Sequence, residues 1–178
     1  MQIQKMKKIL IIALFFGIIS TAKTQGVAPS PPSEVKQRVG LTDITINYSR
    51  PGVKGRTIFG KNGLVPFGKL WRTGANAATK LTFSNDIKIG GQELKSGSYT
   101  ILTKPESSNW EVNFYPYDGS RWSSYQDKTP TITLSTKVIS TENLTETFLI
   151  TINDIRDTSA SLNMIWEKTM VSIPIEVE

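Results

Sequence analysis

The stretch from Gly55 to Thr79, GRTIFGKNGLVPFGKLWRTGANAAT, holds the residues best suited to bind a ligand. An arginine guanidinium is a planar fork that matches a carboxylate, phosphate or sulfate. Successive backbone N–H groups around a glycine such as Gly74 can form an anion-binding nest. The residues that fit this chemistry are Arg56, Trp71, Arg72, Thr73 and Asn76, with Trp71 as an apolar wall. The stretch therefore predicts a site for a small anionic ligand.

The same stretch lies in a basic part of the chain. No aspartate or glutamate occurs between Asp43 and Asp86, and this span carries a charge of +7 from Arg50, Lys54, Arg56, Lys61, Lys69, Arg72 and Lys80. Two interpretations are open. Either these side chains attract an anion, or acids from other strands neutralise them. In the second case the motif is a core plug, in which Trp71 fills the core, Arg72 pairs with an acid and Asn76 closes a turn.

A second candidate surface lies in the aromatic segment from Trp110 to Tyr125, WEVNFYPYDGSRWSSY. Tyr117, Trp122 and Tyr125 fall in the portion rich in Pro, Asp, Gly and Ser, where burial is not guaranteed. Flat aromatic faces with polar neighbours suit saccharide stacking or contact with a protein. The alternative is that these rings cover one end of the folded domain.

The composition excludes most catalytic chemistry. The chain has no histidine and no cysteine, which removes Ser-His-Asp and Cys-His catalysis and nearly all zinc, copper and non-haem iron sites. An oxygen-ligand calcium or magnesium site stays open, but no EF-hand spacing and no phosphate-binding loop motif occur. We therefore expect no metal and no cofactor. Glycoside hydrolysis by paired carboxylates remains an alternative, with candidates at Asp86, Glu93, Glu111 and Asp118.

The first 24 residues have the pattern of a secretory signal peptide. A basic start is followed by an apolar run from Ile9 to Ile19, which is too short to favour a membrane span. Cleavage is expected after Ala22 or Thr24. We expect an exported protein, periplasmic or extracellular, with no transmembrane span in its mature form; an uncleaved anchor is the alternative. The basic residues form no run with interleaved aromatics, so nucleic acid is not an expected partner.

The rest of the chain predicts one all-β domain. Residues 25–33 (QGVAPSPPS) read as a Pro-rich linker, and residues 34–178 form the domain. Alternating runs include Thr42–Ser49, Thr79–Phe83, Ser98–Thr103 and Trp110–Tyr115, and Gly90-Gly91 marks a hairpin turn between 86 and 94. About 8–10 short strands with little helix indicate a single antiparallel β-sandwich, jelly-roll-like or Ig-like.

The C-terminal third has the clearest strand pattern. The runs that begin at Phe148, Leu162 and Val171 each alternate apolar and polar residues, with breaks at Arg156–Ser159 and Glu167-Lys168. This predicts a three-stranded antiparallel meander with one face in the core.

The basic stretch and its flanks resemble a known family. The residues that carry the resemblance are Tyr48-Ser49-Arg50-Pro51, Gly55-Arg56, Phe59-Gly60, Val65-Pro66, Trp71–Asn76, Thr79, Ile89-Gly90-Gly91 and Gly97-Ser98-Tyr99. This pattern is similar to that of a secreted bacterial family, common in Bacteroidota, catalogued as domain of unknown function 2911. The likeness covers the chain after about Glu34. It implies secretion but no activity, because the family has none to transfer.

These observations favour a non-catalytic exported domain. We expect it to bind a small anionic or saccharide ligand, or a partner in the cell envelope, through the Gly55–Thr79 loop. A histidine-free hydrolase or lyase acting on carbohydrate, and a purely structural envelope protein, are the alternatives.

Overall fold

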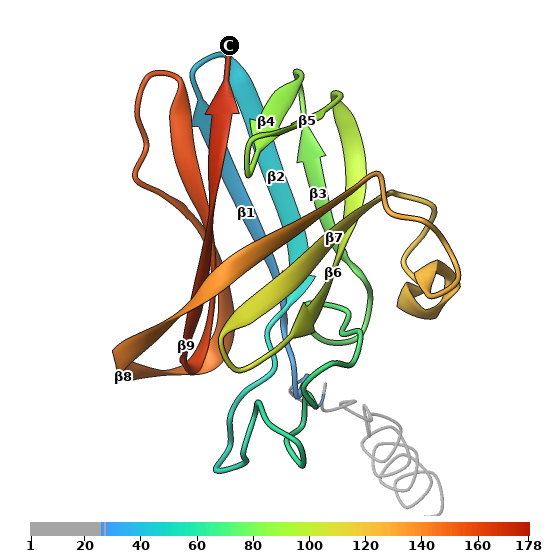
Figure 1. Ribbon diagram of the computed structural model, residues 1–178, viewed down its shortest axis with the longest axis vertical. Coiled ribbons are helices and arrows are strands. Elements are labelled where there is room, and N and C mark those ends of the chain that lie inside the picture. The colour runs from blue at the N-terminus through green and yellow to red at the C-terminus, as the bar shows by residue number, and fades with distance from the viewer. Residues whose placement is uncertain (1–25, 27) are drawn as a thin grey trace, which may run out of the picture.

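The computed structural model describes Gly26 and residues 28–178, so the predicted signal peptide lies outside the described residues. This part contains nine strands and one short 3-10 helix (Figure 1). Their bounds are β1 Pro32–Val39, β2 Thr42–Ser49, β3 Thr79–Phe83, β4 Ile87–Ile89, β5 Gln92–Leu94, β6 Gly97–Pro105, β7 Asn109–Pro116, η1 Trp122–Tyr125, β8 Ile132–Asn153 and β9 Ser159–Val177. No helix within residues 28–178 has the length and apolar character needed to cross a membrane.

All nine strands belong to one antiparallel sheet, in the order β1-β2-β3-β6-β7-β8-β9-β4-β5. β1 and β5 form its two edges and do not pair with each other, so the sheet is open. The predicted all-β, antiparallel class is confirmed, and nine strands fall within the predicted number. The hydrogen-bond ladder is continuous, whereas a sandwich was expected to divide it into two sheets.

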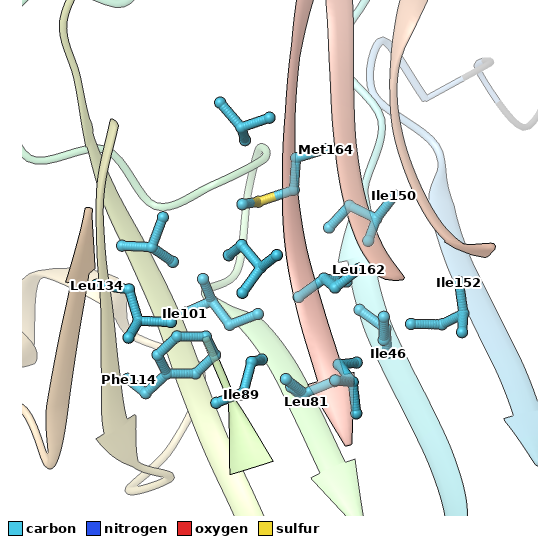
Figure 2. Packing of buried hydrophobic residues seen from close by; sticks show 14 of the residues in the cluster. Ile46, Leu81, Ile89, Ile101, Phe114, Leu134, Ile150, Ile152, Leu162 and Met164 are labelled. Carbon is cyan, nitrogen blue, oxygen red and sulfur yellow. The ribbon is translucent and has the colours of Figure 1, made fainter. Parts of the chain in front are cut away.

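The sheet folds over along β8. Residues 132–137 of this strand pair with β7, and residues 138–153 pair with β9. The inward faces of the two halves therefore enclose one core, in which Ile46 of β2 and Leu81 of β3 lie near Ile150 of β8 and Leu162 of β9 (Figure 2). The alternation of β2, with Ile44, Ile46 and Tyr48 buried, is what the sequence predicted.

The C-terminal third is a long bent hairpin, and the predicted three-stranded meander was wrong. The runs at Leu162 and Val171 are two parts of one strand, β9. At the expected break, Glu167 has a φ of +56° and pairs with Thr145, with register shifts on both sides of that pair. Such an irregularity bends a strand without ending it. Only the break near Arg156 is a loop between strands.

The N-terminal edge of the domain begins earlier than the predicted boundary at 34. β1 starts at Pro32, so the last two residues of the predicted linker are paired with β2. Proline is tolerated at the end of an edge strand because it lacks only the outward N–H. Val35 of β1 packs against the core.

Residues 50–78 connect β2 to β3 and lie at the lower end of the view in Figure 1. We call this segment the motif loop. It is irregular but fixed to the sheet, because Gly52 forms a bridge with Thr147 of β8 and Trp71 forms one with Thr103 of β6. A second small cluster covers the outer face of the sheet nearby, and consists of Ala78, Leu102, Tyr115 and Tyr125, with Leu70 and Trp122 packed against it.

Candidate functional site

Trp71 belongs to an aromatic cluster at the end of the core. Its ring stacks on Trp166 with centroids 5.7 Å apart, and meets Phe148 edge-on at 5.0 Å. Trp110 and Phe59 complete the cluster. The indole N–H of Trp71 donates to the carbonyl of Gly74 at 3.0 Å. Trp71 is therefore partly buried and packs against the core, which meets the plug interpretation only in part.

Three of the predicted polar site residues make internal hydrogen bonds. Thr73 is fully buried and its hydroxyl lies 3.1 Å from that of Thr103. The Asn76 amide donates to the carbonyl of Ser30 at 3.1 Å. The Arg56 guanidinium donates to the carbonyls of Gly52 and Val53 at 2.6 and 3.1 Å, in the turn that precedes it in the loop. These side chains hold the motif loop in shape.

Both Thr73 and Asn76 have left-handed backbone conformations, with φ of +55° and +59°. Gly74 between them has a φ of +149°, and a Cβ there would lie 3.0 Å from the carbonyl oxygen of Ser49. Glycine at this position permits the close approach to β2. The motif Trp71–Asn76 therefore passes close to β2, and most of its polar side-chain atoms already have hydrogen-bond partners.

Arg72 is the exception. Its Nε is buried and has no hydrogen-bond partner within the described residues. Its guanidinium carbon lies 5.9 Å from the ring centroid of Trp122, which is a cation–π distance. Arg72 and Trp122 line a cleft of about 180 Å³ together with Leu64, Val65, Pro66, Lys69, Leu70 and Trp71. We call this space the Arg72 cleft.

No basic side chain of the motif loop forms an ion pair in the described part of the chain. The four ion pairs found there join Lys36 to Glu34, Arg38 to Asp43, Lys95 to Asp86 and Lys128 to Asp118. None involves the seven basic residues that follow Asp43 and precede Asp86. The buried salt bridge that the plug interpretation requires for Arg72 is therefore not found within residues 28–178.

The structure separates the predicted aromatic patch. Trp122 stands at the Arg72 cleft. Tyr125 is fully buried, and its hydroxyl accepts from the N–H of Asp118 at 2.7 Å and donates to the carbonyl of Gly119 at 2.8 Å. Tyr117 lies at a different groove. Trp122 therefore lines the Arg72 cleft, Tyr125 holds its own segment in place, and Tyr117 lies at a separate groove.

Tyr117 belongs to an open groove of about 640 Å³ on the outer face of the sheet. The ammonium of Lys80 lies 4.7 Å from the centroid of the Tyr117 ring. On β1 and β2, Glu34 accepts a hydrogen bond from the amide of Asn47 at 2.7 Å. The hydrogen bond from Lys36 lowers the pKa of Glu34 most, and the hydrogen bond from Asn47 lowers it further. This carboxylate is therefore ionised at neutral pH.

Of the four candidate carboxylates, Glu111 accepts from the amide of Asn113 and Asp118 pairs with Lys128; the other two lie away from the motif loop. Asp86 and Glu93 line a pocket near the β4–β5 hairpin with Glu176 and Glu178, at the opposite end of the molecule in Figure 1. Hydrogen bonds from Lys95 and from the Ser96 N–H lower the pKa of Asp86. Within residues 28–178, no group of three or more acidic side chains is arranged to hold a metal ion.

The sequence did not predict the meeting of Arg72 with Trp122. The two residues are 50 positions apart, and no local sequence pattern around either one indicates that they are in contact. The sequence also did not predict which apolar side chains line the cleft. Among them Leu64 is 48% exposed, which only the folded structure shows.

The comparisons with known proteins assign a family but no activity. The family model described as "Protein of unknown function (DUF2911)" matches residues 30–175. No curated protein and no solved structure matches the chain.

Proposed function

Since the chain belongs to the DUF2911 family, whose description names no activity, we propose from the geometry that it is a non-catalytic binding domain. The ligand is a small anion held in the Arg72 cleft. The observation that carries this proposal is the guanidinium of Arg72, which lines the cleft and forms no ion pair within the described residues. An anionic acceptor would form charge-assisted hydrogen bonds with its terminal amino groups and neutralise it.

The surroundings of Arg72 support binding over hydrolysis. The lining of the Arg72 cleft contains no aspartate or glutamate, whereas glycoside hydrolysis needs two carboxyl groups across the substrate. Trp122 fixes the guanidinium in place through its ring face. A preformed, rigid recognition group of this kind lowers the entropy lost on binding.

The fold provides a rigid support for such a site. We propose that the folded sheet acts as a β-sandwich, because a single core is enclosed between its two halves. Loops at the ends of sandwiches are frequent binding surfaces since the strands hold them in place. The motif loop occupies this position and is attached to β6 and β8 by its two bridges.

We also propose that the protein is exported to the periplasm or beyond. The support is the basic and apolar pattern of residues 1–24. N-terminal sequencing of the protein recovered from the medium or periplasm should give a start at Lys23 or Gln25. Recovery of the full chain, with Met1 intact, in the membrane fraction would contradict cleavage.

Thermal unfolding with a panel of anions tests the binding function. The panel comprises phosphate, sulfate, citrate, glucuronate and benzoate. A ligand of the folded state at 100 times its Kd should raise the Tm by about 5–10 °C. In Arg72→Met the rise should disappear, because the variant keeps the length of the side chain but loses the guanidinium.

Lys61→Met is the matched control. Lys61 is exposed, lies in the same loop and carries the same charge, so this variant should keep the full ligand-induced shift. If both variants lose it equally, general electrostatic attraction is responsible. If no anion raises the Tm of the wild type, the chain is better described as structural.

The Tyr117 groove supports saccharide binding as a second candidate. It is lined by both donors and acceptors, including Glu34, Asn47 and Lys80, around a half-buried tyrosine ring. This mixture suits a polyol, whose hydroxyls both donate and accept. Binding to a glycan array by the wild type, lost in Tyr117→Ala and retained in Arg72→Met, would place a saccharide there.

A further inference from the structure

The hydrogen-bonding character of the Arg72 cleft narrows the ligand class. We infer, on the basis of the proposed function, that its ligand is a small monocarboxylate with a compact apolar body of about the size of benzoate. The juxtaposition that carries this inference is one guanidinium, without an ion pair in the described residues, set in a wall of apolar side chains.

The cleft offers donors but no side-chain acceptors. Its lining consists of Leu64, Val65, Pro66, Lys69, Leu70, Trp71, Arg72 and Trp122, and none of these side chains carries an oxygen. Two backbone carbonyls of the lining are already used, since Pro66 accepts from the N–H of Lys69 and Trp71 accepts from that of Thr103. With no side-chain acceptor in the lining, a polyol would find fewer partners for its O–H donors than a carboxylate, which only accepts hydrogen bonds.

The charge of the site fits one carboxylate. A guanidinium can bind a carboxylate end-on through its two Nη groups, in a pair of parallel hydrogen bonds. The Nε of Arg72 is covered, which leaves the two Nη groups for this geometry. A phosphate or sulfate dianion would have to give up more hydration beside the same apolar wall, with one fixed cation to replace it. Lys69 is exposed and stays largely screened by water.

The volume of the cleft sets the size of the apolar body. It measures about 180 Å³, and a dry apolar cavity of about 150 Å³ is known to accommodate benzene. A six-membered ring with one carboxylate therefore fits, with the ring against Leu70 and Trp122 and the carboxylate on Arg72. Acetate would leave most of the wall wet, and a larger body would protrude.

NMR titration of the purified wild-type protein tests the inference. The signals to follow are the Nε–H of Arg72 and the indole N–H of Trp122. Benzoate should shift both, and acetate, which lacks the apolar body, should bind at least roughly tenfold more weakly. Benzamide, which has the ring without the charge, should also bind at least roughly tenfold more weakly.

Two further probes separate the inference from the proposed function. If glucuronate or inorganic phosphate shifts the same two signals at a lower concentration than benzoate, the monocarboxylate inference is overturned and anion binding at Arg72 stands. If none of the five probes shifts these signals, the proposed function fails and the inference fails with it.

Variants complete the test. Arg72→Lys keeps the charge but loses the fork, and it should weaken benzoate binding by roughly tenfold. Trp122→Leu should weaken it while leaving the fold intact by CD, because Trp122 lies outside the main core. Lys61→Met should leave benzoate binding unchanged. Equal affinity of Arg72→Lys and the wild type would overturn the bidentate contact between guanidinium and carboxylate.

Discussion

The side chains of Trp71 and Arg72 leave the backbone one residue apart and point into different environments. Trp71 forms a bridge with Thr103 of β6, and in such an extended segment successive side chains project to opposite faces. Trp71 therefore enters the aromatic cluster, and Arg72 meets Trp122 on the outer side. The sequence left the plug and the binding site as alternatives. The packing that the plug requires belongs to Trp71, and the proposed binding site belongs to Arg72.

Loss of the Trp71 ring should destabilise the domain strongly. In Trp71→Ala the stacking on Trp166 and the contact with Phe148 disappear and a cavity remains, so we expect a loss of about 3–5 kcal/mol in the free energy of unfolding. Urea denaturation measures it. Leu41→Ala is the control, because Leu41 is 79% exposed and should change stability by less than about 0.5 kcal/mol. A Trp71→Ala variant of wild-type stability would show that the cluster is not part of the core.

At the scale of single residues, the sequence predicted which residues form the motif better than it predicted which residues they contact. It placed Trp71, Thr73 and Asn76 in one motif, and the positive φ values of Thr73 and Asn76 explain why that motif needs its particular composition. It could not predict that the acid expected beside Arg72 is replaced by Trp122, because contacts across 50 residues depend on tertiary packing.

At the scale of elements, the irregularity in β9 decides the shape of the sheet. Glu167 adopts a φ of +56°, which β-branched residues strongly disfavour. We expect Glu167→Val to lower the free energy of unfolding by about 1–2 kcal/mol, and Glu167→Gly to be close to neutral. Lys168→Val, at an exposed neighbour without a positive φ, is the control. Equal stability of the two valine variants in urea would disprove a strained bend.

The segment that carries Trp122 depends on the Tyr125 hydroxyl. In Tyr125→Phe the N–H of Asp118 and the carbonyl of Gly119 lose their partner, at a cost of about 1–2 kcal/mol. Hydrogen exchange at the Asp118 amide should accelerate. Tyr115→Phe is the matched control, since the Tyr115 hydroxyl forms no hydrogen bond within the described residues. Unchanged exchange in Tyr125→Phe would mean that other contacts hold the segment.

The sequence predicted the short hairpins but not the long one. Gly90-Gly91 has a turn geometry with φ of +57° and +79°, and the β4–β5 pair follows from it. In contrast, the middle of β8, residues 140–147, is polar and mostly exposed, so it lacks the alternation by which a strand is recognised. Its pairs with β9 at Ser140 and Thr145, and the bridge between Thr147 and Gly52, identify it as a strand.

For the whole molecule, the free energy of unfolding should depend on pH only at strongly acidic and strongly alkaline pH. Ion pairs lower the pKa of Asp43, Asp86 and Asp118, so the stability they contribute is present above their unfolded pKa, near 3.9, and is lost as pH falls through the lower folded values. Burial raises the pKa of Tyr99 and Tyr115. That contribution is complete below about pH 10 and is lost at higher pH.

Because the chain has no histidine, unfolding free energies should be nearly constant between about pH 5.5 and 9. Thermal or urea denaturation across the pH range measures this. Asp43→Asn removes the partner of Arg38, so the free energy of unfolding of this variant should fall less steeply at acidic pH. Asp127→Asn, at an exposed residue outside the four ion pairs, should not change this slope. A sharp change in the free energy of unfolding near pH 6.5 would contradict this expectation.

The pairing of β4 with β9 also bears on when the molecule can fold. Residues 87–89 find their partners only at 175–177, so the sheet cannot be completed before that late segment has been synthesised. Contacts between such distant segments are slow to form, and β4 and β5 remain without their neighbour until then. The edge formed by β4 and β5 is therefore expected to join the sheet after the hairpins between neighbouring strands have formed.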